Sequence, residues 1–198
     1  MAPGLGLGRR FGRRARLARG AFTIVSVGAA LASIIVSPDA RGLAGAGLAL
    51  LMCAIALYDA RHFLIPNTLA AAAFALALAH AAALDPQAPL APIGIALARA
   101  CVSGGLFLAI RLGYRGWRGR DGLGLGDVKL AAVAGAWLDW FALAVAIEIA
   151  VVAALGSYLV RHRLGKRPIR ATDALPLGLY LAPAIWVGWF LQVTLLAP

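Results

Sequence analysis

GLGLGDVKLAAVAGAWL, residues 122–138, joins a glycine-rich turn to an apolar segment and places one carboxylate, Asp127, at the junction. An ionisable group at membrane depth costs free energy and is by default a candidate functional residue. The preceding Gly124 and Gly126 allow another part of the molecule to approach the backbone closely. Lys129 follows the acid, and its side chain is long enough to return the amino group to the membrane interface. The pattern indicates a membrane helix that begins with a functional acid.

A second acid lies in YDARHFLIPNTL, residues 58–69. Asp59 ends one apolar run, and Ile65-Pro66-Asn67 opens the next. His62 is close enough in sequence to influence Asp59, although an interfacial histidine is more often a bystander. Asp59 and Asp127 are therefore the candidate catalytic pair. The candidate supporting residues are Gly124, Gly126, Lys129, Pro66 and Asn67.

The composition is that of a membrane protein. Of the 198 residues, 62% are hydrophobic, and the mean hydropathy is +0.85. A soluble domain of this size needs a more polar exterior. The apolar runs are continuous and rich in Ala and Leu, which disfavours the alternating pattern of a membrane β-barrel. We predict an all-α, polytopic membrane bundle without a separate soluble domain.

Seven apolar runs predict about seven transmembrane segments. The first is short for a span, so a cleaved signal peptide is an alternative to an uncleaved anchor. The predicted parts are a basic, poorly ordered cytoplasmic tail (1–20), a first anchor with its outer loop (21–42) and a membrane domain (43–198). The runs cover residues 21–36, 43–59, 68–84, 92–112, 127–138, 140–160 and 178–196.

The basic residues predict the orientation of these segments. The formal net charge of +11 does not indicate nucleic-acid binding, because Lys and Arg lie in loops beside the apolar runs, where they orient a chain in the bilayer. With the N-terminus in the cytoplasm and the C-terminus outside, the outer loops hold Arg41 alone. Asp59 and Asp127 then lie at the same depth on the cytoplasmic side. The loops on that side hold Arg61, Arg111, Arg115, Arg118, Arg120, Lys129, Arg161, Arg163, Lys166, Arg167 and Arg170.

Paired carboxylates suit the hydrolysis of an amide by water. Two neighbouring carboxylates do not both ionise easily, so one keeps a proton. The ionised group takes a proton from water, and the protonated group donates to the scissile carbonyl oxygen. Such a site needs no metal and no cofactor, and the two cysteines, Cys53 and Cys101, are too few for a four-ligand zinc site. A helix N-cap remains the competing interpretation of Asp127.

The motifs YDxRxxxIPN and GLGLGDVKL resemble those of the type IV prepilin peptidase family, membrane aspartic proteases of the GxGD type. The later LPLGLYLAP, residues 175–183, resembles a C-terminal segment of that family, with Leu177 where an aromatic residue is usual. The resemblance implies that Asp59 and Asp127 are catalytic. It also implies a multi-pass protein of the bacterial inner membrane that removes leaders from prepilin-like precursors at the cytoplasmic face.

One departure from the family concerns a domain. Longer members carry a cytoplasmic domain with two cysteine pairs and also methylate the new N-terminus. This sequence holds no such pairs, so we expect peptidase activity alone, on prepilin-like partners in a lipid bilayer. Asp121 and Asp173 are acids on the predicted inner side, and each is a candidate contact for a basic leader or simply a solvated loop acid. No oligomeric state follows from the sequence.

Two further charges lie inside predicted spans. Arg99 and Glu148 are each roughly 10–12 Å from the predicted outer ends of their helices, at 1.5 Å per residue. A buried pair would relieve both charges, so we expect a structural contact between them.

Two alternatives to a prepilin peptidase remain at this point. A relative of presenilin or signal peptide peptidase would share Tyr58-Asp59 and GxGD, although here two spans separate the acid-bearing helices. A small proton-coupled transporter could use the acids as relay groups, but such acids usually lie near the midplane between repeated halves.

Overall fold

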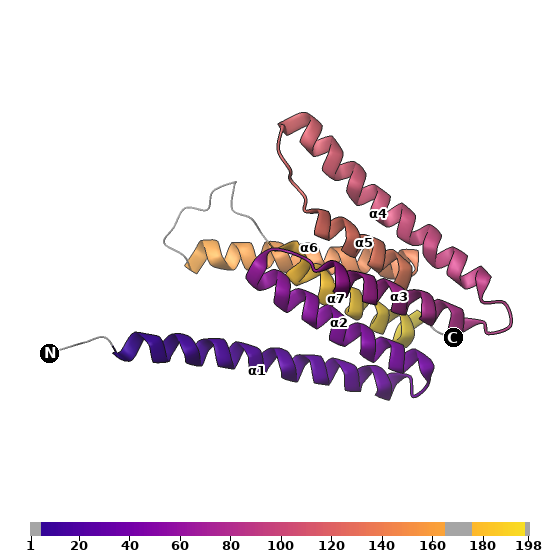
Figure 1. The fold of residues 1–198 in the computed structure, drawn as a ribbon, viewed down its shortest axis with the longest axis horizontal. Coiled ribbons are helices and arrows are strands. Elements are labelled where there is room, and N and C mark those ends of the chain that lie inside the picture. Colours follow the sequence, from indigo (N-terminus) through magenta and orange to yellow (C-terminus); the bar gives the residue numbers. More distant parts are fainter. Residues whose placement is uncertain (1–4, 165–175, 197–198) are drawn as a thin grey trace.

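A computed structural model describes residues 5–164 and 176–196, and every regular element in these ranges is helical. The described residues form seven α-helices and one short π-helical turn, η1, and Figure 1 shows how the labelled α-helices are arranged. The all-α fold expected from the sequence is therefore confirmed. The elements are α1 (Leu5–Val36), α2 (Ala40–His62), α3 (Asn67–Leu84), α4 (Leu90–Arg118), α5 (Leu125–Trp137), α6 (Trp140–Leu164), α7 (Leu177–Leu191) and η1 (Gln192–Leu196).

Each predicted apolar run forms one helix, and the main difference is at the N-terminus. The helix α1 begins at Leu5, whereas the sequence analysis predicted a poorly ordered tail up to residue 20. Leu, Arg and Ala are good helix formers, so the basic segment continues the apolar helix without a break. The helix ends at Val36, where Pro38 restricts the backbone of the residue before it.

Local chemistry explains why α2 begins where it does. The Asp39 carboxylate accepts hydrogen bonds from the Ser37 hydroxyl (2.7 Å) and from the N–H groups of Arg41 (2.9 Å) and Gly42 (3.2 Å). It satisfies N–H groups that have no partner within the helix. The hydrogen bonds, first from Ser37 and then from Gly42, hold the pKa of Asp39 below its usual value.

The helices surround α2 and α7. In Figure 1, α1 and α4 lie at opposite edges of the bundle, with α2, α7 and α5 between them. The helix α2 packs against α1, α3 and α7, while α5 packs against α3, α4 and α7. The core between them holds large, fully buried side chains, including Leu48, Met52, Leu130, Ile185 and Trp189.

Five of the described helical segments are long and apolar enough to cross a membrane, which makes the chain a multi-pass membrane protein. The helix α5 is too short to be one of these spans. Its 13 residues are about 20 Å long, whereas the hydrocarbon core of a bilayer is about 30 Å thick. The helix packs within the bundle against the longer helices α3, α4 and α7.

The closest helix contact is between α4 and α5. Ser103 of α4 donates a hydrogen bond to the Ala131 carbonyl of α5 (2.9 Å). A Cβ atom at Gly135 would fall 2.2 Å from the Ser103 Oγ and 2.5 Å from the Arg99 carbonyl oxygen. The absence of a side chain at Gly135 therefore permits this packing.

We expect Gly135→Ala to lower the stability of the purified protein by roughly 1–3 kcal/mol, because the added methyl group pushes α4 and α5 apart. Thermal unfolding in detergent measures the change. Gly105→Ala is the matched control, since its Cβ would have nothing within 4 Å. Equal unfolding temperatures for the two variants would show that this contact does not hold the helices together.

Candidate active site

Asp59 lies in the last turn of α2 and is 4% exposed. Its Oδ2 accepts a hydrogen bond from the backbone N–H of Leu179 at 3.0 Å. Leu179 is in the first turn of α7, and its N–H is shared between the Asp59 carboxylate and the carbonyl oxygen of the N-cap residue Pro176, at 3.2 Å. The N-terminus of α7 therefore positions the Asp59 carboxylate.

Gly178 makes this approach possible. A Cβ atom there would lie 2.9 Å from both the Asp59 Oδ2 and the Ile65 Cδ1. Real Cβ atoms essentially never come so close to other heavy atoms. A larger residue at position 178 would displace the carboxylate or the isoleucine.

Asp127 lies in the first turn of α5 and is half-buried. Its Oδ2 accepts a hydrogen bond from the Gly124 N–H at 3.3 Å. The capping interpretation of this acid therefore describes one of its contacts. That contact leaves the other carboxylate oxygen, Oδ1, available for other chemistry.

Both carboxylates line one cavity of about 250 Å³. Asp59 reaches it from α2 and Asp127 from α5, so the structure brings the two predicted acids together. Two glycines let the backbone come close to the Ile65 side chain. A Cβ atom at Gly126 would lie 3.0 Å from this side chain, and one at Gly178 would lie 2.9 Å from it. The cavity is lined by Asp59, Phe63, Leu64, Ile65, Asn67, Gly124, Leu125, Gly126, Asp127 and Lys129.

Lys129 and Asn67 connect two helices at the cavity wall. The Lys129 Nζ donates to the Asn67 Oδ1 at 2.6 Å, which joins α5 to the start of α3. Pro66 is the N-cap residue of α3. Four of the predicted supporting residues thus line the cavity with the two acids, whereas Pro66 does not. The four are Asn67, Gly124, Gly126 and Lys129.

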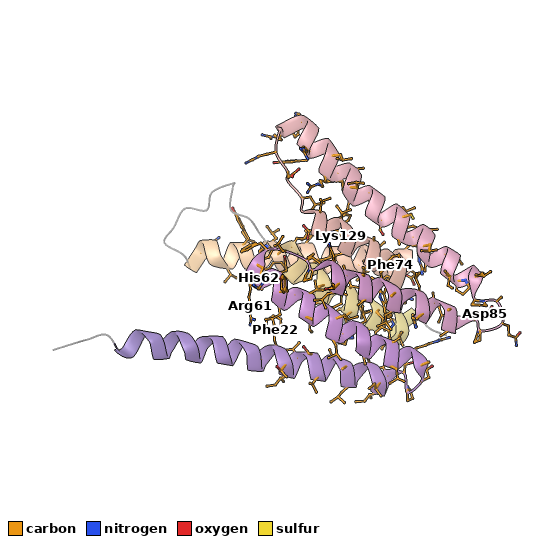
Figure 2. All side chains as sticks on the ribbon, in the orientation of Figure 1. Phe22, Arg61, His62, Phe74, Asp85 and Lys129 are labelled. Carbon is orange, nitrogen blue, oxygen red and sulfur yellow. The ribbon has the colours of Figure 1, made fainter. Side chains whose placement is uncertain are left out.

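His62 does not line this cavity. Its ring stacks on Tyr58 with centroids 4.2 Å apart, and its Nδ1 lies 3.1 Å from the Tyr58 carbonyl oxygen. Figure 2 labels His62 and Lys129 at the same end of the bundle. These contacts favour the interpretation of His62 as a bystander.

The loop before α5 is anchored by Arg111 of α4, which is 8% exposed. Its guanidinium donates to the Leu123 carbonyl and to the Asp121 Oδ2, the latter at 2.8 Å. Arg115 lies 3.8 Å from the same carboxylate. Asp121 therefore has cationic partners within its own chain, and its contact with a leader stays a prediction. Asp173 lies outside the described residues.

Arg99 and Glu148 do not form the pair that the sequence analysis expected. Glu148 is exposed on α6, and Arg99 lines another cavity together with Asp139. Depth along two helices predicted the pairing, but it does not fix which faces of the helices meet. The expected structural contact is therefore absent.

Three site residues had no role in the sequence analysis: Ile65, Gly178 and Leu179. Leu179 contributes its backbone N–H, and Gly178 contributes the space where a side chain would be. Neither residue type therefore indicates a site in the sequence. A glycine two residues after Pro176, at a helix start, was the available signal. Among the described residues, no three His, Cys, Asp or Glu side chains gather as a metal site would require.

Comparisons with known proteins agree with this geometry. The model of the type IV leader peptidase family matches residues 46–159. Leader peptidase HopD of Escherichia coli is 34% identical over 135 residues, which cover 67% of this chain and 83% of that protein. A prepilin leader peptidase/N-methyltransferase of Burkholderia pseudomallei is 36% identical over 141 residues, 59% of this chain and 45% of that protein. No solved structure matches.

We expect Arg111→Leu to loosen the loop at residues 119–124, because a buried charged hydrogen-bond network loses its donor. Amide hydrogen exchange in this loop should quicken by about tenfold or more. Arg115→Leu is the control, since Arg115 is exposed and makes only the longer contact. Unchanged exchange in Arg111→Leu would mean that the arginine does not hold the loop.

Proposed function

Because the chain belongs to the type IV leader peptidase family, we propose that Asp59 and Asp127 are the catalytic pair with which it removes leaders from prepilin-like precursors. Relatives are named leader peptidases and prepilin leader peptidases, and this chain is an aspartic endopeptidase of that kind. The family match leaves the presenilin-like and transporter alternatives without support.

One observation supports the pair most strongly: the two acids, far apart in the sequence, line a single cavity. Asp59 is buried and is held by the N–H of Leu179, while Asp127 begins the short helix α5. Most acids in a membrane protein have a structural or interfacial explanation. An acid that is buried opposite a second acid, with a cavity between them, is a much better candidate for catalysis.

The proposed reaction is a general acid–base hydrolysis. The ionised carboxylate takes a proton from water, and the water oxygen bonds to the scissile carbonyl carbon. The protonated carboxylate donates to the carbonyl oxygen, which becomes a hydroxyl in the tetrahedral intermediate. When the intermediate collapses, the C–N bond breaks and the leaving nitrogen takes the proton that the first carboxyl group received from water. The second carboxylate takes a proton from a hydroxyl of the intermediate, so each group returns to the proton state in which it began.

The proposed orientation places this cavity at the cytoplasmic face of the bacterial inner membrane. The support is the distribution of charge, because the predicted loops at that side hold nearly all of the basic residues. Arg61, two residues after Asp59, and Arg111, which holds the loop before α5, are among them. A precursor helix would then enter the bilayer beside the bundle while its leader stays in the cytoplasm.

A basic leader needs acidic partners, and Asp121 and Asp173 remain the proposed candidates. Asp121 lies in the loop that leads to Asp127, which favours a position near the substrate. It is already paired with Arg111, so a leader would have to compete for its carboxylate. Asp121 is therefore proposed as a secondary contact, and the catalytic proposal does not depend on it.

We expect Asp59→Asn and Asp127→Asn each to reduce cleavage of a co-expressed prepilin by at least about 100-fold, because each removes a proton-transfer group while keeping the shape. Precursor and product are separated by size, and membrane levels of the variants are compared. Asp85→Asn is the control, since this acid caps a turn at the other end of the bundle. Cleavage that persists in either site variant would refute the paired mechanism.

We also expect Gly178→Ala to lower cleavage by about 100-fold, because the new methyl group displaces the Asp59 carboxylate and small misplacements are costly in catalysis. Gly156→Ala in α6 is the control, with nothing within 4 Å of its added Cβ. The same assay measures both variants. Full activity in Gly178→Ala would show that Asp59 needs no bare backbone beside it.

A further inference from the structure

A second polar cavity lies at the end of the bundle remote from the two acids. It has a volume of about 320 Å³, at the lower end of the range for ligand pockets. Five helices and the turn after α5 contribute to its wall. We call this cavity the outer recess. Its polar lining residues are Arg41, His80, Arg99, Asp139, Trp189 and Gln192.

The outer recess is well separated from the candidate active site. Arg41 is in the first turn of α2 and Asp59 in its last, about 27 Å apart at 1.5 Å per residue. Figure 2 shows Asp85, in the turn between α3 and α4, at the end of the bundle away from His62 and Lys129. The recess lies where the short helix α5 ends at Trp137, and its longer neighbours continue past that point.

Three residues that line this cavity each carry a buried polar atom for which the described part of the structure gives no hydrogen-bond partner. These atoms are the Trp189 Nε1, the Arg99 Nε and the His80 Nδ1. Trp189 is 1% exposed, so its N–H is removed from bulk solvent. Buried polar groups almost always have hydrogen-bond partners, and an unpaired one calls for an explanation.

The unpaired state of Trp189 is specific to this position. The indole N–H of Trp137 donates to the Ala73 carbonyl at 3.0 Å, and that of Trp186 donates to the Ser33 hydroxyl at 3.0 Å. The Trp189 ring is fixed against the backbone of Gly45, where a Cβ atom would fall 2.0 Å from it. Packing thus holds an unused donor at the wall of the recess.

The charges of the outer recess favour an anion. Among the described residues, neither Arg41 nor Arg99 forms an ion pair. The one acid, Asp139, is partly occupied, since its Oδ1 accepts a hydrogen bond from the Ala142 N–H at 2.7 Å. The Gln192 side-chain oxygen is also occupied, by the Asp139 N–H at 3.0 Å. Free donors and positive charge therefore exceed free acceptors.

We propose that the outer recess binds a phosphate group, with Arg99, Arg41 and the Trp189 N–H as its ligands. Arginine and N–H donors match the oxygens of a phosphate, and charge-assisted hydrogen bonds of this kind are stronger than neutral ones. Leu84 and Ile95, which are 46% and 58% exposed, line the same recess and offer apolar contact for acyl chains. A phospholipid headgroup is thus one source of the phosphate, and free phosphate is the other.

The test uses the full chain, purified in detergent without phosphate. Three probes are titrated: dioctanoyl phosphatidylglycerol, dioctanoylglycerol, which lacks the phosphate, and inorganic phosphate. Binding is measured by native mass spectrometry and by the shift in unfolding temperature. A shift with phosphatidylglycerol alone assigns the site to a lipid, and a shift with inorganic phosphate as well assigns it to the phosphate group itself.

Arg99→Gln should weaken binding by at least about tenfold, since a charge-assisted hydrogen bond is lost. Trp189→Phe keeps the packing and removes only the N–H, so it should weaken binding while the ligand-free protein unfolds as wild type does. The controls are Arg118→Gln and Trp140→Phe, whose side chains do not line the recess. The proposal fails if no phosphate probe binds, if dioctanoylglycerol binds equally well, or if both recess variants bind as wild type does.

Discussion

The length of α5 is the constraint on which the rest of this structure depends. Thirteen residues cannot cross a bilayer, yet α5 packs among helices of 15 to 29 residues in the bundle. Its first turn, which carries Asp127, is level with the starts of α3 and α7, since Gly126 and Gly178 both lie against Ile65. Its last turn ends at Trp137, beside the outer recess. One polar cavity therefore lies at each end of α5.

The site depends on glycines, which leave space for neighbouring groups, as much as on hydrogen bonds to the carboxylates. Gly178 and Gly126 flank Ile65, and Gly178 also lies against Asp59, where any Cβ would collide. The N-terminus of α7 then supplies a backbone N–H to Asp59. This arrangement positions a buried acid that forms no ion pair within residues 5–164 and 176–196.

Local pattern predicted the helices well and some contacts poorly. Apolar runs and breaks such as Ser37-Pro38 and Pro66-Asn67 located all seven helices, because helix formation in an apolar setting depends mainly on nearby residues. The predicted poorly ordered tail differs from the structure, in which α1 begins at Leu5. The Arg99–Glu148 contact was also wrong, because depth along a helix says nothing of the direction in which a side chain points.

The sequence by itself determined the fold class, the seven helices and the identity of the two acids, because hydropathy and short motifs are local properties. Only the tertiary structure decided that Asp59 and Asp127 share one cavity, that Leu179 and Gly178 contact Asp59, and that Arg111 pairs with Asp121. It also decided that three residues with unpaired buried polar atoms line the outer recess. These features depend on which faces of distant helices meet, and that is set by packing over the whole bundle.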